Sequence, residues 1–171
     1  MTTPNDLADI PIAGKQRALS AVTAGTHAHV TRNGQWAKAV QAYLASISFV
    51  DRQIGRLVDC LDRTSYADNT IIVLFSDHGW HLGEKQAWGK QTGWIHSTQV
   101  PLIFCGPTVQ AGTLCQETVS LLDLFPTLAE VTGFPTRGLD GVSLAHLLKD
   151  PTHITERTVK TYINSEDFVL S

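Results

Sequence analysis

Hydrophobic residues recur at helical spacing over one long stretch of the chain. From Trp36 onward, apolar side chains return every three or four positions, and mostly polar or small residues stand between them. This period is typical of an amphipathic helix that buries one face. It predicts a helix from Trp36 to Leu61, with an apolar stripe formed by Val40, Tyr43 or Leu44, Ile47, Val50, Ile54, Leu57 and Leu61.

Two short apolar runs predict strands. Residues 70–75 (TIIVLF) are β-branched or apolar at every position, and residues 100–104 (VPLIF) form a second run that ends before Gly106 and Pro107. A strand that is apolar on both faces is typical of a sheet covered by helices on each side. A long helix followed by such a strand favours an α/β layer architecture.

The remaining stretches predict loops and shorter elements. Residues 1–35 contain several Pro and Gly and no sustained apolar period, so we expect an irregular lead-in with a short helix at most. Residues 76–99 are polar and rich in Gly, which predicts a long loop. Ser120 and Gly133 are placed to cap and to end a helix. Two helices and a last strand are thus expected over residues 121–131, 144–148 and 158–163.

Composition and charge narrow the class of protein. The 171 residues are 43% apolar and 17% charged, which is enough apolar material for one domain with a buried core. The net charge of −3 and the absence of a Lys/Arg run argue against nucleic acid and anionic membranes as partners. The longest apolar run, residues 71–75, is far shorter than the roughly 18 residues of a membrane span.

Two further features are interpreted from the sequence alone. Residues 1–9 carry two aspartates and no basic or apolar cluster, so they do not resemble a secretory signal, and the compartment stays unassigned. The three cysteines are too few and too scattered for a disulfide framework or a metal knuckle. We therefore expect each of them to be a buried thiol: Cys60, Cys105 and Cys115.

Candidate chemistry begins directly after the first predicted strand. In open α/β sheets, ligands bind at the carboxyl ends of the strands, and Asp77 and His78 follow residues 70–75 closely. Their carboxylate and imidazole are able to turn toward one cation, and Gly79 permits a tight backbone there. Alternatively, Asp77 caps a turn and His78 is merely exposed. The residues alone leave both interpretations open.

The wider pattern resembles a known family. Residues 76–85 (SDHGWHLGEK), then residues 88–90 (WGK), then residues 100–104 (VPLIF) are similar to the sulfatase family, especially to its iduronate- and choline-sulfatase-like branch. The resemblance runs in one order and spacing over residues 36–150. Further matching segments are YLASI (43–47), DNT (68–70), DLFPTL (123–128) and LDGVSL (139–144).

The resemblance implies an alkaline-phosphatase-like three-layer α/β/α sandwich, incomplete in this chain. Residues 1–171 would form a partial catalytic domain: an irregular lead-in (1–35), the matched core (36–150) and the start of a truncated C-terminal part (151–171). Asp77 and His78 would complete a Ca²⁺ site. Lys90, at a spacing of 12 from His78, would contact the sulfate and the nucleophile. His96 is a candidate substrate contact.

The family's nucleophile is not found in this sequence. Sulfatases use a formylglycine made from the cysteine of a Cys-x-Pro/Ala-Ser/Thr-Arg motif. The nearest segment here starts at Cys105, but Val109 stands where the motif requires arginine. We interpret Cys105 as structural. The formylglycine and the aspartate pair of the metal shell are therefore expected in a missing N-terminal half of the domain.

Other residues of the loop have structural interpretations. His81 forms a His-x-x-His pair with His78, but neighbouring glycines argue against the helix that a zinc pair requires, so a packing or supporting contact is favoured. Three tryptophans in this loop would either line a sugar-sized cleft or anchor the loop, and we favour anchoring: Trp80, Trp88 and Trp94. Ile95 stands where the family often has glutamate, so this segment departs from the family pattern.

Three functional interpretations follow. The preferred one is a segment of a sulfuric ester hydrolase that acts on a small-molecule or saccharide sulfate ester and is inactive as an isolated chain. The second keeps the fold but hydrolyses phosphoesters or phosphonates. The third is a truncated, catalytically inactive fragment. Two side-chain ligands cannot fill a shell of six to eight oxygens, so we expect weak calcium binding by the isolated chain.

Overall fold

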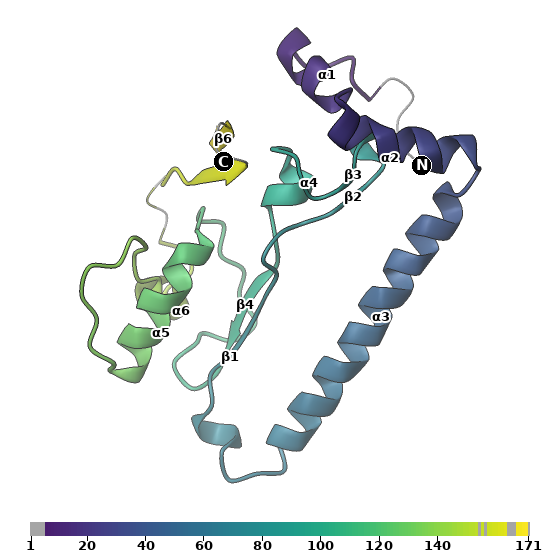
Figure 1. Cartoon of the computed structure of the whole chain (residues 1–171). Coiled ribbons are helices and arrows are strands. Elements are labelled where there is room, and N and C mark those ends of the chain that lie inside the picture. The colour runs from purple at the N-terminus through teal and green to yellow at the C-terminus, as the bar shows by residue number, and fades with distance from the viewer. Residues whose placement is uncertain (1–5, 154, 156, 164–166, 171) are drawn as a thin grey trace. The chain divides into compact units, whose positions relative to one another are not determined.

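The computed structural model describes residues 6–153, 155, 157–163 and 167–170 (Figure 1). The chain divides into two compact units, and each is described by itself. The first comprises Met1–Ala67 and His78–Val100, and the second comprises Asp68–Asp77 and Pro101–Ser171. Within the described residues, none of the helices combines the length and the apolar character that crossing a bilayer requires.

Three helices open the first unit. They are α1 (Ile12–Ala18), α2 (Ala21–Arg32) and α3 (Trp36–Leu61). The predicted long helix is confirmed with the expected bounds. The prediction of an irregular lead-in over residues 1–35 is wrong, because α1 and α2 occupy most of this stretch. Their apolar residues show little helical period, and α2 is instead held by packing against α1, α3 and the loop that follows residue 78. Such tertiary contacts override a weak local pattern.

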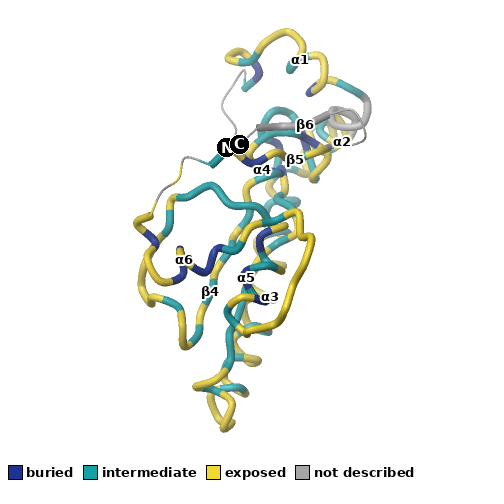
Figure 2. The backbone as a smooth tube through the Cα atoms, turned by 90° about the vertical axis from the view of Figure 1, so that its left-hand side faces the viewer, coloured by how far each residue is buried: buried dark blue, intermediate teal, exposed yellow. Residues whose placement is uncertain are grey.

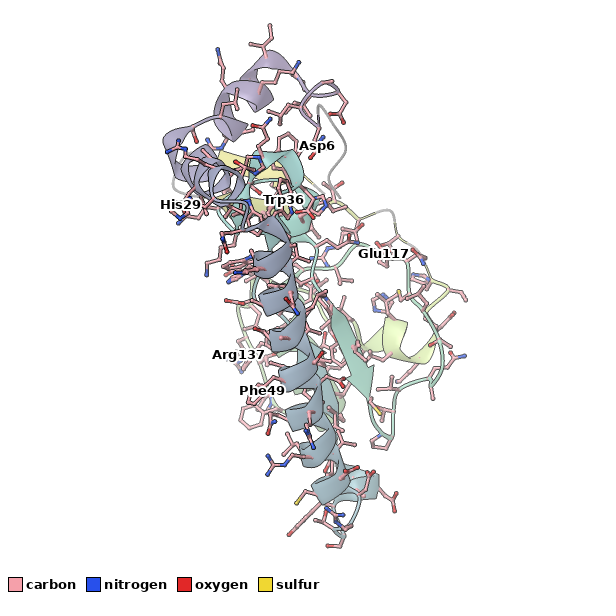
Figure 3. All side chains as sticks on the ribbon, turned by 90° about the vertical axis from the view of Figure 1, so that its right-hand side faces the viewer. Asp6, His29, Trp36, Phe49, Glu117 and Arg137 are labelled. Atoms are coloured by element: carbon pink, nitrogen blue, oxygen red, sulfur yellow. The ribbon has the colours of Figure 1, made fainter. Side chains whose placement is uncertain are left out.

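The apolar stripe of α3 is not covered as predicted. None of its 26 residues is buried, and Figure 2 draws the helix in the colours of exposed and intermediate residues. Leu57 of the stripe is 72% exposed. Phe49, halfway along the helix, is also exposed (Figure 3). The sequence identified the helix correctly but not its surroundings, because periodicity shows which face is apolar and says nothing of what covers it.

A small hairpin follows in the first unit. Strands β2 (His81–Leu82) and β3 (Trp88–Gly89) pair antiparallel across the 3₁₀ turn η2 (Glu84–Gln86), and a short helix, α4 (Ile95–Thr98), comes after them. Gly83 begins the turn at φ +115°. A Cβ atom there would lie 2.1 Å from the Trp36 ring, so only glycine fits. The predicted loop is confirmed in outline, with these short elements inside it.

The second unit contains two pairs of strands. β1 (Ile72–Phe75) pairs antiparallel with β4 (Leu102–Cys105), and β5 (Lys160–Ile163) pairs with β6 (Asp167–Leu170). The strands predicted over residues 70–75, 100–104 and 158–163 are confirmed, and β6 was missed. The expectation of burial on both faces is wrong: in β1 and β4 no residue is fully buried, since no helix in the described part of the second unit packs extensively on either strand.

Short helices build the core of the second unit. η3 (Leu121–Asp123) runs into α5 (Leu124–Thr132), and α6 (Ala145–Lys149) packs nearby. Ser120 forms the predicted cap: its hydroxyl accepts from the Leu122 amide, and its own amide donates to Asp123. Gly133 ends α5 at φ +72° as expected. Three apolar residues of α6 are buried: Ala145, Leu147 and Leu148. Figure 2 accordingly colours part of α6 as buried.

A buried carboxylate ties this core to distant segments. Asp123 has no exposed surface and accepts hydrogen bonds from the Val142 amide (2.9 Å) and from both terminal nitrogens of Arg157. Thr127, also fully buried, donates to the Asp123 carbonyl and accepts from the Leu144 amide. Burial raises the pKa of the Asp123 carboxyl, but the hydrogen bonds from Arg157 and the amides outweigh it, so the pKa lies below its ordinary value.

Substituting Asp123→Ala should destabilise the second unit by about 3–5 kcal/mol, because it leaves the Arg157 guanidinium without its carboxylate and two amides without their acceptor. Urea unfolding followed by hydrogen exchange of peptides from residues 120–150 measures the loss. The control is Asp140→Ala, an exposed aspartate that should change stability by about 0.5 kcal/mol or less. Equal losses in the two variants would contradict the assignment.

Candidate active-site loop

Two of the three predicted site residues of the first unit, His78 and Lys90, lie together. Nζ of Lys90 is 2.7 Å from Nε2 of His78, and Nδ1 of His78 is 2.8 Å from the Gly79 carbonyl oxygen. A carbonyl only accepts, so Nδ1 of His78 carries the hydrogen. Nε2 then offers its lone pair to the Lys90 ammonium. The imidazole of His78 is thus oriented with an electron pair toward a cation.

Gly79 lets two parts of the loop approach closely. Its amide donates to the Ser97 carbonyl oxygen at 2.8 Å. A Cβ atom at this position would lie 2.0 Å from the His96 carbonyl oxygen, so a larger residue would push the two segments apart. The sequence analysis predicted correctly that this position requires glycine, but it gave a tight turn as the reason. The structure gives close backbone packing as the reason.

His81 lies at the centre of the loop. It is fully buried, with Nδ1 3.0 Å from the Glu84 carbonyl oxygen and Nε2 2.7 Å from Oγ1 of Thr92. Oγ1 of Thr92 is in turn 2.9 Å from Oγ of Ser97. Burial lowers the pKa of the His81 imidazole, and the nearby His96 adds to this, while the Glu84 carbonyl acts in the opposite direction. The expected packing role of His81 is confirmed.

Aromatic side chains anchor the loop on the helices of its unit. The Trp88 ring packs edge-on against Trp36 at 5.7 Å between centroids, and Nε1 of Trp88 donates to Nδ1 of His27 (3.3 Å). Trp36 lies at the end of α3 that adjoins α2 (Figure 3). The Trp80 ring stacks on Tyr43, 6.3 Å between centroids. The anchoring interpretation is confirmed for Trp88 and Trp80.

An ion-pair cluster that the sequence analysis missed connects the N-terminal segment to the loop. Nζ of Lys85 lies 2.9 Å from Asp9 and 3.4 Å from Asp6. The hydrogen bond with Asp9 raises the pKa of Lys85, and the same bond lowers the pKa of Asp9. Lys85 adopts φ +53°, a region that L-residues rarely occupy. Because 76 residues separate Lys85 from Asp9, no local pattern could have revealed the contact.

The other predicted residues are placed as follows. Asp77 is the last residue of the first segment of the second unit, directly before His78. His96 is exposed on α4, and its ring lies 5.1 Å from that of His81, centroid to centroid. Among the described residues, no group of three or more His, Cys, Asp or Glu is arranged to hold a metal ion. The described residues thus offer two candidate ligands, Asp77 and His78, that are adjacent in sequence, and no third His, Cys, Asp or Glu grouped with them.

The cysteines differ from their predicted state. Cys60 and Cys105 are exposed, and Cys115 is partly exposed, so the expectation of buried thiols is wrong. Cys60 lies on α3 and Cys105 on β4, two elements that the described chain covers incompletely, whereas Cys115 lies outside the helices and strands. All three are free of disulfides.

Comparison with known proteins identifies relatives of this chain. The family model described as "Sulfatase" matches residues 9–134. A sulfatase from Formosa agariphila is 43% identical over 75% of this chain and 25% of its own length. A choline-sulfatase from Rhizobium meliloti is 40% identical over 63% of this chain and 22% of its own length. The chain therefore spans about a quarter of the length of these curated relatives.

Solved structures give a consistent result. A protein solved with its substrate D-glucosamine-2-N,6-O-disulfate is similar at TM-score 0.62 and 27% identity, over 75% of this chain and 29% of that one. A phosphonate monoester hydrolase from Silicibacter pomeroyi is similar at TM-score 0.55 and 35% identity, over 58% of this chain and 20% of that one. The expected alkaline-phosphatase-like α/β fold, present in part, is confirmed.

Acidification should destabilise the first unit through His81. The folded state holds this imidazole neutral with a lowered pKa, whereas the unfolded chain protonates it near its ordinary value of about 6.5. Below that pH the unfolded state binds more protons, so the free energy of unfolding falls as the pH drops from about 7 toward 5. Urea unfolding followed by tryptophan fluorescence reports this unit, which contains all four tryptophans.

The variant His81→Asn should lose this part of the pH dependence, while His29→Asn, at an exposed histidine of the same unit, should retain it. An unchanged pH dependence in the His81 variant would contradict the assignment of a buried neutral imidazole.

Proposed function

The chain belongs to the sulfatase family, and from that premise we propose that it supplies part of the active site of a sulfuric ester hydrolase. Asp77 and His78 are proposed as two ligands of a divalent cation, and Lys90 as the residue that contacts the sulfate group. His96 is proposed as a further substrate contact. The nucleophile, a formylglycine, would come from a part of the domain outside this chain.

The observation that carries this proposal is the contact between Lys90 and His78. Their nitrogen atoms are 2.7 Å apart, and the hydrogen on Nδ1 of His78 is held by the Gly79 carbonyl. With the hydrogen on Nδ1, the single lone pair of Nε2 faces a positive partner: the Lys90 ammonium holds it here, and a bound cation would take the place of that ammonium at Nε2. The Asp77 carboxylate, next in the chain, adds a hard oxygen donor of the kind that calcium prefers.

The chemistry of ester hydrolysis explains why both positive groups are useful. A sulfate ester develops negative charge on its sulfuryl and leaving oxygens as the bond breaks. A bound divalent cation would neutralise charge on the sulfuryl oxygens. The Lys90 ammonium would donate to the same group, and a fixed donor of this kind lowers the barrier without reorganisation during the reaction.

Calcium is the proposed cation on the strength of the family resemblance. Imidazole alone would favour a zinc-like ion, whereas a carboxylate suits calcium. The two ligands of this chain provide a minor part of a calcium shell, so the remaining ligands are assigned to the same missing part as the nucleophile. The isolated chain is accordingly proposed to be inactive.

The proposed substrate class is a saccharide or small-molecule sulfate ester. A structural relative binds a disulfated glucosamine, which supports a sulfated sugar. The second candidate is a phosphonate or phosphate ester, which the similarity to a phosphonate monoester hydrolase supports. Hydrolysis of either ester would use the same cation and the same lysine. The two reactions differ in whether a sulfuryl or a phosphoryl group is attacked.

The gene sequence upstream of residue 1 tests this proposal. We expect an in-frame Cys-x-Pro/Ala-Ser/Thr-Arg motif preceded by a pair of aspartates. A serine or threonine nucleophile in that place would transfer the proposal to phosphoester chemistry. A start codon at Met1 with no such motif in the reading frame would overturn it and leave the inactive fragment.

Two substitutions separate the proposed roles in the complete reading frame. Asp77→Ala should remove both the bound metal, measured by mass spectrometry, and the hydrolysis of 4-nitrophenyl sulfate. Lys90→Ala should leave the metal and reduce turnover by about 10²-fold or more, because a donor to the developing charge is lost. Exposed residues serve as matched controls, Asp140→Ala and Lys38→Ala. Normal activity in the Asp77 variant would refute the metal assignment.

A further inference from the structure

The hydrogen bonds around His81 run in one fixed direction. The Glu84 carbonyl only accepts, so Nδ1 of His81 must carry the hydrogen and Nε2 must accept. The Thr92 hydroxyl therefore donates its only hydrogen to Nε2. Oγ1 of Thr92 is then left as the acceptor for the hydroxyl of Ser97. The result is an ordered chain from Ser97 through Thr92 and His81 to the Glu84 backbone.

This chain holds Lys90 from both sides. The backbone of His81 is paired with Gly89, directly before Lys90, in the β2–β3 hairpin. Its side chain binds Thr92, two residues after Lys90, and the Thr92 amide donates to the Lys90 carbonyl at 2.9 Å. The backbone of Lys90 is thus fixed between two points that both belong to His81.

The same chain also holds the partner of Lys90. Ser97, whose hydroxyl binds Thr92, accepts the Gly79 amide through its carbonyl oxygen. Gly79 adjoins His78 and binds its Nδ1. Both members of the contact between Lys90 and His78 are therefore connected to one buried network. A shift of Thr92 would change the distance between them.

We propose that His81 is a positioning residue, which acts through Thr92 to hold the Lys90 ammonium at its place beside His78. This inference rests on the proposed function of Lys90. His81 touches neither the substrate nor the cation in this assignment. A histidine is suited to the role because its ring is rigid and places one donor and one acceptor on opposite sides, as the Glu84 carbonyl and the Thr92 hydroxyl require.

A double-mutant cycle in the complete enzyme tests the inference. Thr92→Val removes the hydroxyl at nearly constant shape, and we expect it to lower kcat/KM for 4-nitrophenyl sulfate by about 10–100-fold, since small misplacements of a catalytic group cost this much. The conservative Thr92→Ser keeps the hydroxyl and should retain activity. In the Lys90→Met background, Thr92→Val should cause no further loss, because the group it positions is gone.

A purely structural role of the network gives a different result. It predicts that Thr92→Val lowers activity by the same factor in both backgrounds, and this outcome overturns the inference while leaving the proposed function intact. An unchanged kcat/KM in Thr92→Val, with Lys90→Met impaired, also overturns it. If Lys90→Met itself has normal activity, the proposed function fails first. His29→Asn is the control that should leave every value unchanged.

A second variant and a measurement without catalysis cover the case in which Thr92→Val does not fold. Ser97→Ala removes the outer member of the network and should give the same non-additive pattern with Lys90→Met, at a smaller factor. Nitrogen–proton correlation spectra of the chain should show His81 as the neutral form with hydrogen on Nδ1 at pH 7. The opposite tautomer would overturn the inference whatever the kinetics show.

Discussion

A neutral imidazole with a hydrogen bond at each nitrogen is the constraint on which the loop of the first unit depends. Buried polar groups are costly unless satisfied, so His81 has to keep both Glu84 and Thr92 in reach. Meeting that requirement brings residues 81–97 into one arrangement. The contact between Lys90 and His78 is then a consequence of the loop's own hydrogen bonds.

Local patterns predicted the regular elements well. The helical spacing of apolar residues was sufficient to predict α3. Short apolar runs bounded by turn-forming residues were sufficient to predict β1 and β4. Cap chemistry at Ser120 placed the start of the helical segment that leads into α5. The lead-in helices were missed because their stability comes from packing on α3 and the loop, and burial was overestimated because a periodic pattern does not specify its covering partner.

The candidate site was predictable in part. The position of Asp77 and His78 after a strand, and the family spacing to Lys90, came from the sequence. The salt bridge between Lys85 and Asp9 and the hydrogen bond between His81 and Thr92 were not predictable from the sequence. The partners are separated by 76 residues in the first case and by 11 in the second, so they meet only after folding. His96 was named as a substrate contact, and the ring it meets among the described residues is that of His81.

The strand pair β1–β4 has a practical consequence for handling the protein. Among the described residues, each strand has the other as its hydrogen-bonded neighbour, so each leaves one row of backbone amides and carbonyls open. Such rows, beside exposed apolar side chains such as Phe75 and Ile103, act as templates for edge-to-edge association. The isolated chain should therefore be prepared dilute, with its aggregation tracked against concentration, before any affinity or unfolding midpoint is interpreted.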